Sequence, residues 1–259
     1  MESPTLRIEA RGITDVGRRR DHNEDALLVD EPLGLFIVAD GMGGHAGGGT
    51  ASRLAVETIQ AAVRHAKEKE PEVFGSAPES VEASPVPDVL REAVEEACAV
   101  IYRTAQGDPE LAGMGTTVTA VLVDGRVAYV AHVGDSRCYL VRQGRIYQVS
   151  EDHSLVNEQL KAGAISADEA KHSRFKNIIT RSVGFEQQVQ VDLMGLELEP
   201  GDALVVCCDG LSNLVDDPEI LAVVGESTLD LAPGRLVALA NDRGGDDNIT
   251  VIVIRTLAA

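Results

Sequence analysis

Basic residues are scarce in this chain. It carries 23 Lys and Arg against 42 Asp and Glu, a formal net charge of -19 over 259 residues. Nucleic-acid phosphates and anionic membrane surfaces both attract positive charge, so this imbalance argues against either as a partner. The acids suit a solvated surface, and they also leave carboxylates free for hard cations, which prefer oxygen ligands.

Long apolar runs and paired cysteine motifs are also missing. No stretch approaches the roughly 20 apolar residues that span a bilayer, and the N-terminus MESPTLRIEA lacks the regions of a signal peptide. Cys98, Cys138, Cys207 and Cys208 show no C-x-x-C spacing, which favours reduced thiols over zinc or redox chemistry. We expect a cytoplasmic protein, and since no apolar surface pattern demands a partner, a monomer.

The length and the hydrophobic content of 44% suit one well-buried domain over residues 1–259. Residues 67–88 are rich in Glu, Pro and Ser and show little periodicity, which predicts a loop or a partly mobile insertion. Whether that segment docks a partner or only spaces two elements is open.

Two kinds of periodicity alternate along the chain. Apolar residues at helical spacing predict amphipathic helices over 51–66 and 90–102. From Gly115 the period becomes two, and Asp124-Gly125 and Gln143-Gly144 mark hairpin turns. A polar helical stretch follows over 154–172, with a capping box at Ser166 to Glu169. Grouped hairpins with grouped helices indicate an α+β domain with mostly antiparallel sheet.

The segment FIVADGMGGHAGGG at 36–49 ends an apolar run on Asp40 beside a glycine loop, which is typical of a strand ending at a site. Residues 41–46 also satisfy G-x-G-x-x-A, the dinucleotide pattern. Against that oxidoreductase interpretation, Asp40 would repel a pyrophosphate, and the hairpins that follow are not the parallel units of a Rossmann half.

Acidic residues recur at the ends of apolar strands. They are Asp40 after FIVA, Asp135 in HVGDSR, Asp209 in VVCCDG, and Asp246 with Asp247 before NITVIVI. One such acid is usually a turn or cap residue, but several converging carboxylates would repel one another unless cations neutralised them. Acids without accompanying Cys or His favour Mg²⁺ or Mn²⁺ over zinc.

Six motifs carry a family resemblance, in order and over nearly the whole chain. They are Arg20-x-x-Asn23-Glu24-Asp25, Asp40-Gly41-Met42-Gly43-Gly44, Gly113-Met-Gly-Thr-Thr117, Gly134-Asp-Ser-Arg137, Cys208-Asp-Gly210 and Asp247-Asn248. Together they resemble the metal-dependent serine/threonine protein phosphatases of type 2C, the PPM family, in their short bacterial form. The resemblance implies a four-layer αββα sandwich, two mostly antiparallel sheets flanked by helices, with a flap at about 151–184.

The resemblance also implies a site with two core ions, Mn²⁺ or Mg²⁺, and a third, weaker one. Asp40 would bridge the core pair, and Asp209 with Asp247 would complete the ligands of the first ion. The Gly41 carbonyl would bind the second ion, with Glu24 as a direct or water-mediated ligand and Asp25 holding a metal-bound water. Asp135 with Asp209 would hold the third ion. A water or hydroxide bridging the ions would attack phosphorus, without a phosphoenzyme, while Arg20 grips the phosphate. The expected substrates are phosphorylated proteins, including Ser/Thr kinases, whose signalling the enzyme would reverse.

Two positions depart from the family pattern. Met42 stands where animal relatives carry a histidine proposed as the general acid, and His45 is the nearest candidate for that catalytic role. Asn213 stands where many relatives have an acid, which should weaken the third ion site. A non-catalytic relative that binds phosphoproteins is the alternative function, and a nucleotide-dependent oxidoreductase is the third.

Overall fold

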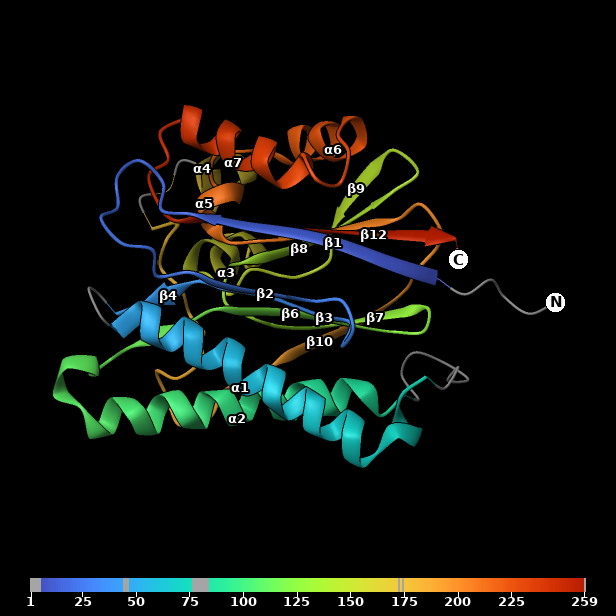
Figure 1. The fold of residues 1–259 in the computed structure, drawn as a ribbon. Coiled ribbons are helices and arrows are strands. Elements are labelled where there is room, and N and C mark those ends of the chain that lie inside the picture. The colour runs from blue at the N-terminus through green and yellow to red at the C-terminus, as the bar shows by residue number, and fades with distance from the viewer. Residues whose placement is uncertain (1–5, 44–46, 76–83, 172, 174, 259) are drawn as a thin grey trace.

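The computed structural model describes residues 6–43, 47–75, 84–171, 173 and 175–258. Two sheets stack face to face, and helices cover the outer face of each sheet, which gives four layers (Figure 1). The expected α+β sandwich is confirmed.

Each large sheet has five strands, and every strand pair in them is antiparallel. The first has the order β1 (Leu6–Asp15), β12 (Ile249–Ala258), β11 (Ala203–Cys207), β8 (Arg137–Arg142), β9 (Arg145–Gln148). The second has the order β10 (Asp192–Glu197), β7 (Val127–Val133), β6 (Val118–Asp124), β3 (Leu35–Ala39), β2 (Ala26–Asp30). A short pair, β4 (Gly41–Met42) and β5 (Gly115–Thr116), extends past β3. Dinucleotide binding by residues 41–46 is therefore not favoured, since a Rossmann half needs parallel strands.

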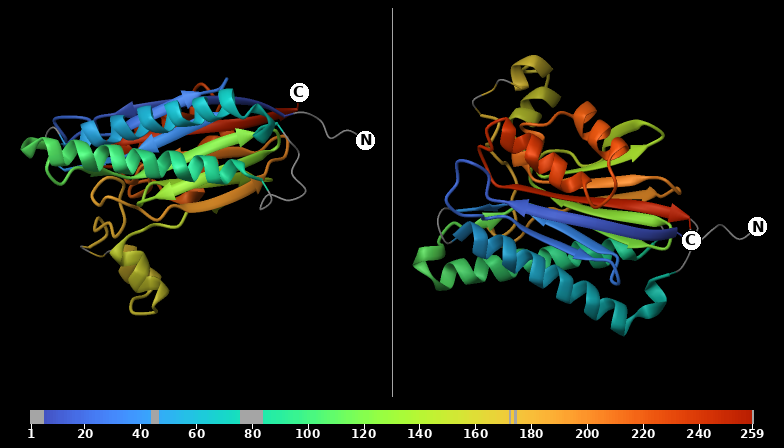
Figure 2. Two further views of the ribbon diagram at one scale, coloured as in Figure 1. Left: turned by 90° about the horizontal axis from the view of Figure 1, so that it is seen from below. Right: turned by 45° about the horizontal axis from the view of Figure 1, so that its top comes forward.

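Two long helices, α1 (Gly47–Lys69) and α2 (Val86–Gly107), cover the second sheet. Three helices near the C-terminus, α5 (Asp209–Ser212), α6 (Asp217–Glu226) and α7 (Ala232–Asp242), cover the first sheet. Two short helices, α3 (Leu155–Lys161) and α4 (Ala167–Lys171), project from the sandwich (Figure 2). Single-turn helices η1 (Pro71–Val73) and η3 (Pro109–Leu111) complete the described elements.

Strand alternation explains why the central strands are apolar throughout. In β11, Ala203, Val205 and Cys207 pack against the helices, whereas Leu204 and Val206 face the opposite sheet. Both faces of the strand are thus buried, so a continuous apolar run is required where a solvent-facing strand would alternate. The predicted hairpin turn at Gln143-Gly144 is confirmed, and both of its residues have left-handed φ, 51° and 72°.

The helices extend beyond their predicted bounds. Both ends of the 67–88 segment, predicted as a loop, are helical: α1 continues to Lys69 and α2 begins at Val86. Residues 76–83 of that segment lie outside the described part of the chain. Within 154–172, where one helical stretch was expected, α3 and α4 are separate, and the predicted capping box is present between Ser166 and Glu169. Among the described helices, none is long and apolar enough to cross a membrane.

Candidate active site

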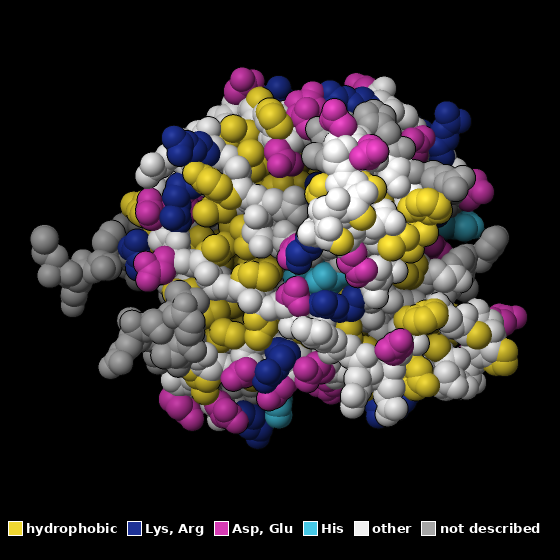
Figure 3. Space-filling view, turned by 180° about the vertical axis from the view of Figure 1, so that it is seen from behind, with side chains coloured by type: hydrophobic (Ala, Val, Ile, Leu, Met, Phe, Trp, Pro, Cys, Tyr) yellow, Lys and Arg dark blue, Asp and Glu magenta, His cyan; other side chains and the backbone are white. Residues whose placement is uncertain are grey.

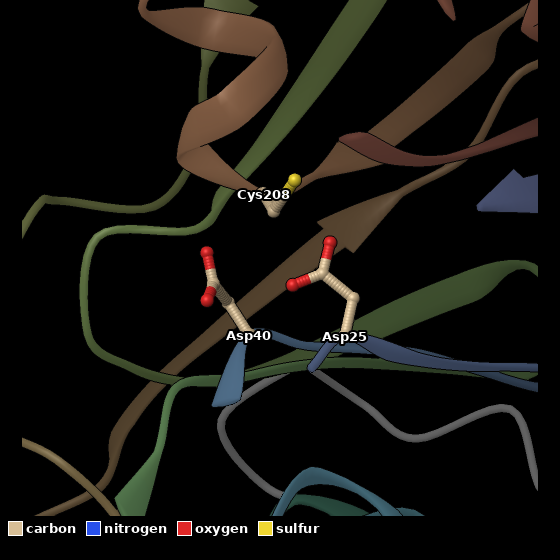
Figure 4. Close-up of side chains that lie close together, drawn as sticks. All are labelled: Asp25, Asp40 and Cys208. Atoms are coloured by element: carbon tan, nitrogen blue, oxygen red, sulfur yellow. The ribbon is translucent and has the colours of Figure 1, made fainter. Parts of the chain in front are cut away.

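Strand parity brings the first acids together between the two sheets. Phe36 and Val38 of β3 face the opposite sheet, so Asp40, two positions on, continues the same face. Ala26 pairs with Ala39, which sets Asp25 opposite Asp40 at the end of the hairpin. From the other sheet, Cys208 reaches the same space, and ligand atoms of the three residues lie within 4.8 Å of one another (Figure 4).

The backbone of Asp40 is held on both sides by one residue. The Asp40 N–H donates to Thr117 Oγ1 at 3.0 Å, and the Thr117 N–H donates to the Asp40 carbonyl at 2.9 Å. Thr117 in turn shares a hydrogen bond of 2.8 Å with the hydroxyl of Ser136. These buried contacts fix the direction in which the Asp40 carboxylate points.

Gly41 stands where two backbone segments come too close for a side chain. A Cβ at Gly41 would lie 2.2 Å from the carbonyl oxygen of Gly48 and 2.4 Å from that of Glu24. The start of α1 therefore packs directly on the strand end, and the Glu24 side chain lies against Gly48. The glycine loop brings main-chain atoms close to the acidic cluster.

The remaining predicted acids come from three different elements. Asp135 follows β7 and is 6% exposed, Asp209 is the first residue of α5, and Asp247 precedes β12. All three are close enough to act electrostatically on Asp40. The structure thus assembles at one end of the sandwich acids spread over more than 220 residues of sequence.

Burial and mutual repulsion disfavour the ionised form of the carboxyl groups in this cluster. Burial, and then the negative charges of four neighbouring carboxylates, raises the pKa of Asp40 well above its ordinary value; the neighbours are Asp25, Asp209, Asp135 and Asp247. Burial likewise raises the pKa of Asp25 to about 7 and that of Asp135 to about 8. For Asp209, burial and then the charge of Asp247 raise the pKa. The cluster needs positive charge to ionise fully at neutral pH.

Two carboxylate oxygens of the cluster support the same conclusion. Oδ1 of Asp25 and Oδ1 of Asp135 are buried and have no hydrogen-bond partner among the described residues. A buried oxygen without a hydrogen-bond partner destabilises the fold unless another group satisfies it. Carboxylate oxygens of this kind are the ligands that hard divalent cations prefer. The structure brings Cys208 to these acids, so the expectation of acids without an accompanying Cys is wrong. Because burial raises the pKa of the Cys208 thiol well above its usual value, the carboxylates are the better ligands, and they fit Mg²⁺ or Mn²⁺.

Arg20 and Asn248 connect the first loop to this cluster. Arg20 Nη2 donates to Asp247 Oδ2 at 2.7 Å, so the arginine predicted to grip phosphate lies at the rim of the site. Asn248, which is 3% exposed, accepts from the Glu24 N–H at 2.8 Å.

A cleft of about 750 Å³ opens beside Asp135 and Asp209. One wall is formed by the flap, residues 151–184, through Ser154, Asn157, Leu160 and Lys176; the other includes Asn213, Asp216 and Arg243. The flap projects from the face seen in Figure 3, where acidic and basic side chains are interspersed. The cleft is large enough for an extended peptide segment next to the acids.

The structure places most of the predicted site residues close together. The structure brings Asp25, Asp40, Asp135, Asp209 and Asp247 together, with Gly41 and Glu24 packed beside them and Arg20 bonded to Asp247, while their chemical roles stay predictions. His45 lies outside the described residues. At the two departures from the family pattern, Met42 pairs with Gly115, and Asn213 donates to Asp209 Oδ2 at 3.0 Å.

Sequence reasoning assigned no role to Thr117, Asn248 or Cys208, although each lies in a motif that the resemblance used. All three hold or touch the cluster from buried positions. Their motif membership was the available signal, but only the strand register shows which acid each one contacts.

Comparison with known proteins agrees with this geometry. Residues 16–235 match the family model for Protein phosphatase 2C. The serine/threonine phosphatase stp of Listeria monocytogenes is 38% identical over 245 residues, covering 93% of each chain. The Mycobacterium tuberculosis serine/threonine phosphatase PstP/Ppp superposes with a TM-score of 0.84 at 32% identity, over 98% of this chain and 100% of that one.

A further solved structure is the catalytic domain of the serine threonine protein phosphatase PstP in complex with 2 manganese ions. It is 34% identical, with a TM-score of 0.81, over 98% of this chain and 100% of that chain. The chain therefore belongs to the protein phosphatase 2C family of serine/threonine phosphatases.

Proposed function

We propose that this chain hydrolyses phosphoserine and phosphothreonine in proteins, using two divalent cations, Mn²⁺ or Mg²⁺, held by the acidic cluster. The observation that carries the proposal is the convergence of five carboxylates between the sheets, two of them with buried oxygens that lack a partner among the described residues. The manganese ions of the PstP structure support the choice of metal.

We assign the cation ligands residue by residue. Asp40, at the centre of the cluster, would contact both core ions, and Asp209 with Asp247 would complete one of them. The Gly41 carbonyl and Glu24 would serve the other, since both lie where strand end and helix start meet. Asp25 would support the core pair from its buried position, and Asp135 with Asp209 would hold a third, weaker ion.

Divalent cations at such a site supply an activated water as nucleophile and neutralise charge on the phosphoryl group. Arg20 would bind two phosphate oxygens through its planar fork and so orient phosphorus toward the cluster. Among the described residues, Cys208 also reaches the cluster, but burial raises the pKa of its thiol well above its usual value and so disfavours the thiolate that could form a phosphoenzyme. The neighbouring carboxylates would hold the cations, so direct transfer to water is the proposed route. His45 is the proposed proton donor to the leaving alcohol.

Phosphorylated proteins, Ser/Thr kinases among them, are the proposed substrates, because the cleft beside Asp135 and Asp209 extends well beyond the size of a phosphate. The four cysteines are buried free thiols, which fits a reducing compartment such as the cytoplasm. A non-catalytic phosphoprotein binder is less favoured, because such a module would not need the whole cation cage.

The test is hydrolysis of a phosphothreonine peptide by the wild type and by Asp209→Ala, with Mn²⁺ and then with EDTA. We expect Mn²⁺-dependent phosphate release that falls about a hundredfold or more in the variant, since one cation loses a ligand. A folded, Mn²⁺-supplied wild type that releases no phosphate would overturn the proposal and favour the binding module.

A further inference from the structure

The two ends of the flap are joined to each other before they reach the sandwich. The Leu155 N–H donates to the Ile178 carbonyl at 2.9 Å, and the Thr180 N–H donates to the His153 carbonyl at 2.9 Å. Ser154 and Ile179 form a bridge between these contacts. The flap therefore rises from a short, paired stem.

His153 attaches this stem to the residue before Asp135. Its backbone N–H donates to the Gly134 carbonyl at 2.7 Å, and its ring Nδ1 accepts from the Gly134 N–H at 3.0 Å. One residue of the stem thus satisfies both polar backbone groups of Gly134. Gly134 itself cannot shift easily, because its φ is 111° and a Cβ there would lie 2.5 Å from Thr117 Cγ2.

These contacts fix the tautomer of His153. Because Nδ1 accepts a hydrogen bond, the ring proton is on Nε2, which faces Asp192 Oδ2 at 3.0 Å and donates to it. The other oxygen of Asp192 accepts from Arg181 Nη1 at 2.6 Å. A continuous series of hydrogen bonds therefore links Arg181 at the end of the flap to Asp192 in β10. It continues through His153, at the start of the flap, to Gly134.

The surroundings of His153 indicate that it positions the flap and does not take part in the chemistry. It is 7% exposed, and its ring lies 4.9 Å from that of His132, centroid to centroid. Both ring nitrogens are already engaged, so the ring has no free atom to offer a substrate. Ser154, the next residue, and Asn157 line the cleft, so a shift of His153 would move that wall.

We propose that His153 and Asp192 are positioning residues that lock the flap stem to the backbone beside Asp135, so that the cleft keeps the shape that receives a phosphoprotein segment. The inference rests on the proposed phosphatase function. It also gives Arg181 a role: the guanidinium holds the far side of Asp192 and so ties the exit of the flap to its entrance.

The test uses two variants that interrupt this series of hydrogen bonds at different points. His153→Asn keeps an acceptor near the place of Nδ1 for the Gly134 N–H but cannot reach Asp192, and Arg181→Lys weakens the contact on the other side. The control is His65→Asn, an exposed histidine on α1 far along the chain from the flap. Each protein is assayed with Mn²⁺ on a phosphothreonine peptide and on p-nitrophenyl phosphate, which is too small to span the cleft.

We expect KM for the peptide to rise about three- to tenfold in both flap variants, the factor that one net hydrogen bond corresponds to. Both kinetic constants for p-nitrophenyl phosphate, and kcat for the peptide, should stay within about twofold, because the acidic cluster is unchanged. Hydrogen exchange of the stem amides of Leu155 and Thr180 should accelerate in the same variants and not in the control.

A peptide KM within about twofold of wild type, or an equal rise of KM for both substrates, would overturn the proposal. If His153→Asn does not fold, Arg181→Lys provides the same test, because Arg181 is the partly exposed end of this series of hydrogen bonds. A wild type inactive on both substrates would refute the phosphatase function instead, and the exchange of the stem amides would then decide whether His153 holds the flap.

Discussion

The side-chain oxygen of Asn248 accepts a hydrogen bond from the backbone N–H of Glu24 at 2.8 Å. The amide nitrogen of Asn248 donates to the carbonyls of Val16 and His22, each at 3.0 Å. One buried side chain therefore fixes three points of the loop between β1 and β2 and places Glu24 next to the segment that carries Asp247.

Replacing Asn248 by Asp should destabilise the protein. A carboxylate there would face two carbonyl oxygens and would leave both without a donor, so the free energy of unfolding should fall by about 2–4 kcal/mol. Urea denaturation measures the change. The control Asn177→Asp, at an exposed position, should change it by less than about 0.5 kcal/mol; equal effects of the two substitutions would contradict the account.

Gly41→Ala should be damaging for a steric reason. The new methyl group would lie 2.2 Å from the Gly48 carbonyl oxygen, so the start of α1 must move away. We expect a loss of about 2 kcal/mol or more in the free energy of unfolding. The matched control is Gly225→Ala in α6, where a Cβ meets nothing within 4 Å; it should gain about 0.5–1 kcal/mol. Similar melting curves for the two variants would count against the close approach.

His132 should make stability depend on pH. Burial, and then the neighbouring His153, lowers the pKa of His132 to about 4, whereas the unfolded chain titrates near its ordinary value of about 6.5. Between these values the unfolded state binds a proton that the folded state does not. The contribution of neutral His132 is therefore complete above about pH 6.5 and is lost as the pH falls toward 4, by about 3 kcal/mol in total.

The measurement compares urea unfolding of the wild type and of His132→Gln at pH 7, 5.5 and 4.5, values chosen to cross that window. The difference in unfolding free energy between the two proteins should shrink as the pH falls. With His65→Gln as an exposed control the difference should change little. A pH-independent difference for His132→Gln would show that the histidine is not held neutral.

Arg20 should matter far more than the arginine two residues before it. A lysine cannot reproduce the planar fork, so Arg20→Lys should raise KM for a phosphopeptide about tenfold. Arg18, in the same basic run, is exposed, and its backbone N–H bonds to the Gly245 carbonyl, a contact that survives substitution. Arg18→Lys should leave KM within about twofold; steady-state kinetics that rank the two variants equally would remove Arg20 from phosphate binding.

Much of the fold could be predicted from apolar patterning alone. ALVVC is apolar at every position because both faces of β11 are buried, and the turn at Gln143-Gly144 closes the predicted hairpin. Helix ends were harder to predict. The pattern around Lys67 and Val86 is polar because those turns face solvent on one side, yet the backbone remains helical.

Asp40, Asp135, Asp209 and Asp247 could be predicted because each lies at one end of an apolar strand, whereas Glu24 and Asp25 came only from the family resemblance. Their supporting residues could not, since Thr117 and Asn248 act through contacts across sheets, and a single sequence does not fix the register between sheets. The same holds for His153 and Asp192, which lie 39 residues apart and meet only through the pairing of β10 with β7.

The central claim is that the carboxylates between the sheets hold a pair of divalent cations. Isothermal titration of the metal-free protein with Mn²⁺, for the wild type and for Asp40→Asn, tests it most directly. The account predicts about two tightly bound ions per wild-type chain and loss of that pair in the variant, because Asp40 lies at the centre of the cluster. A wild type that binds no Mn²⁺, or a variant that binds it as the wild type does, would contradict the account.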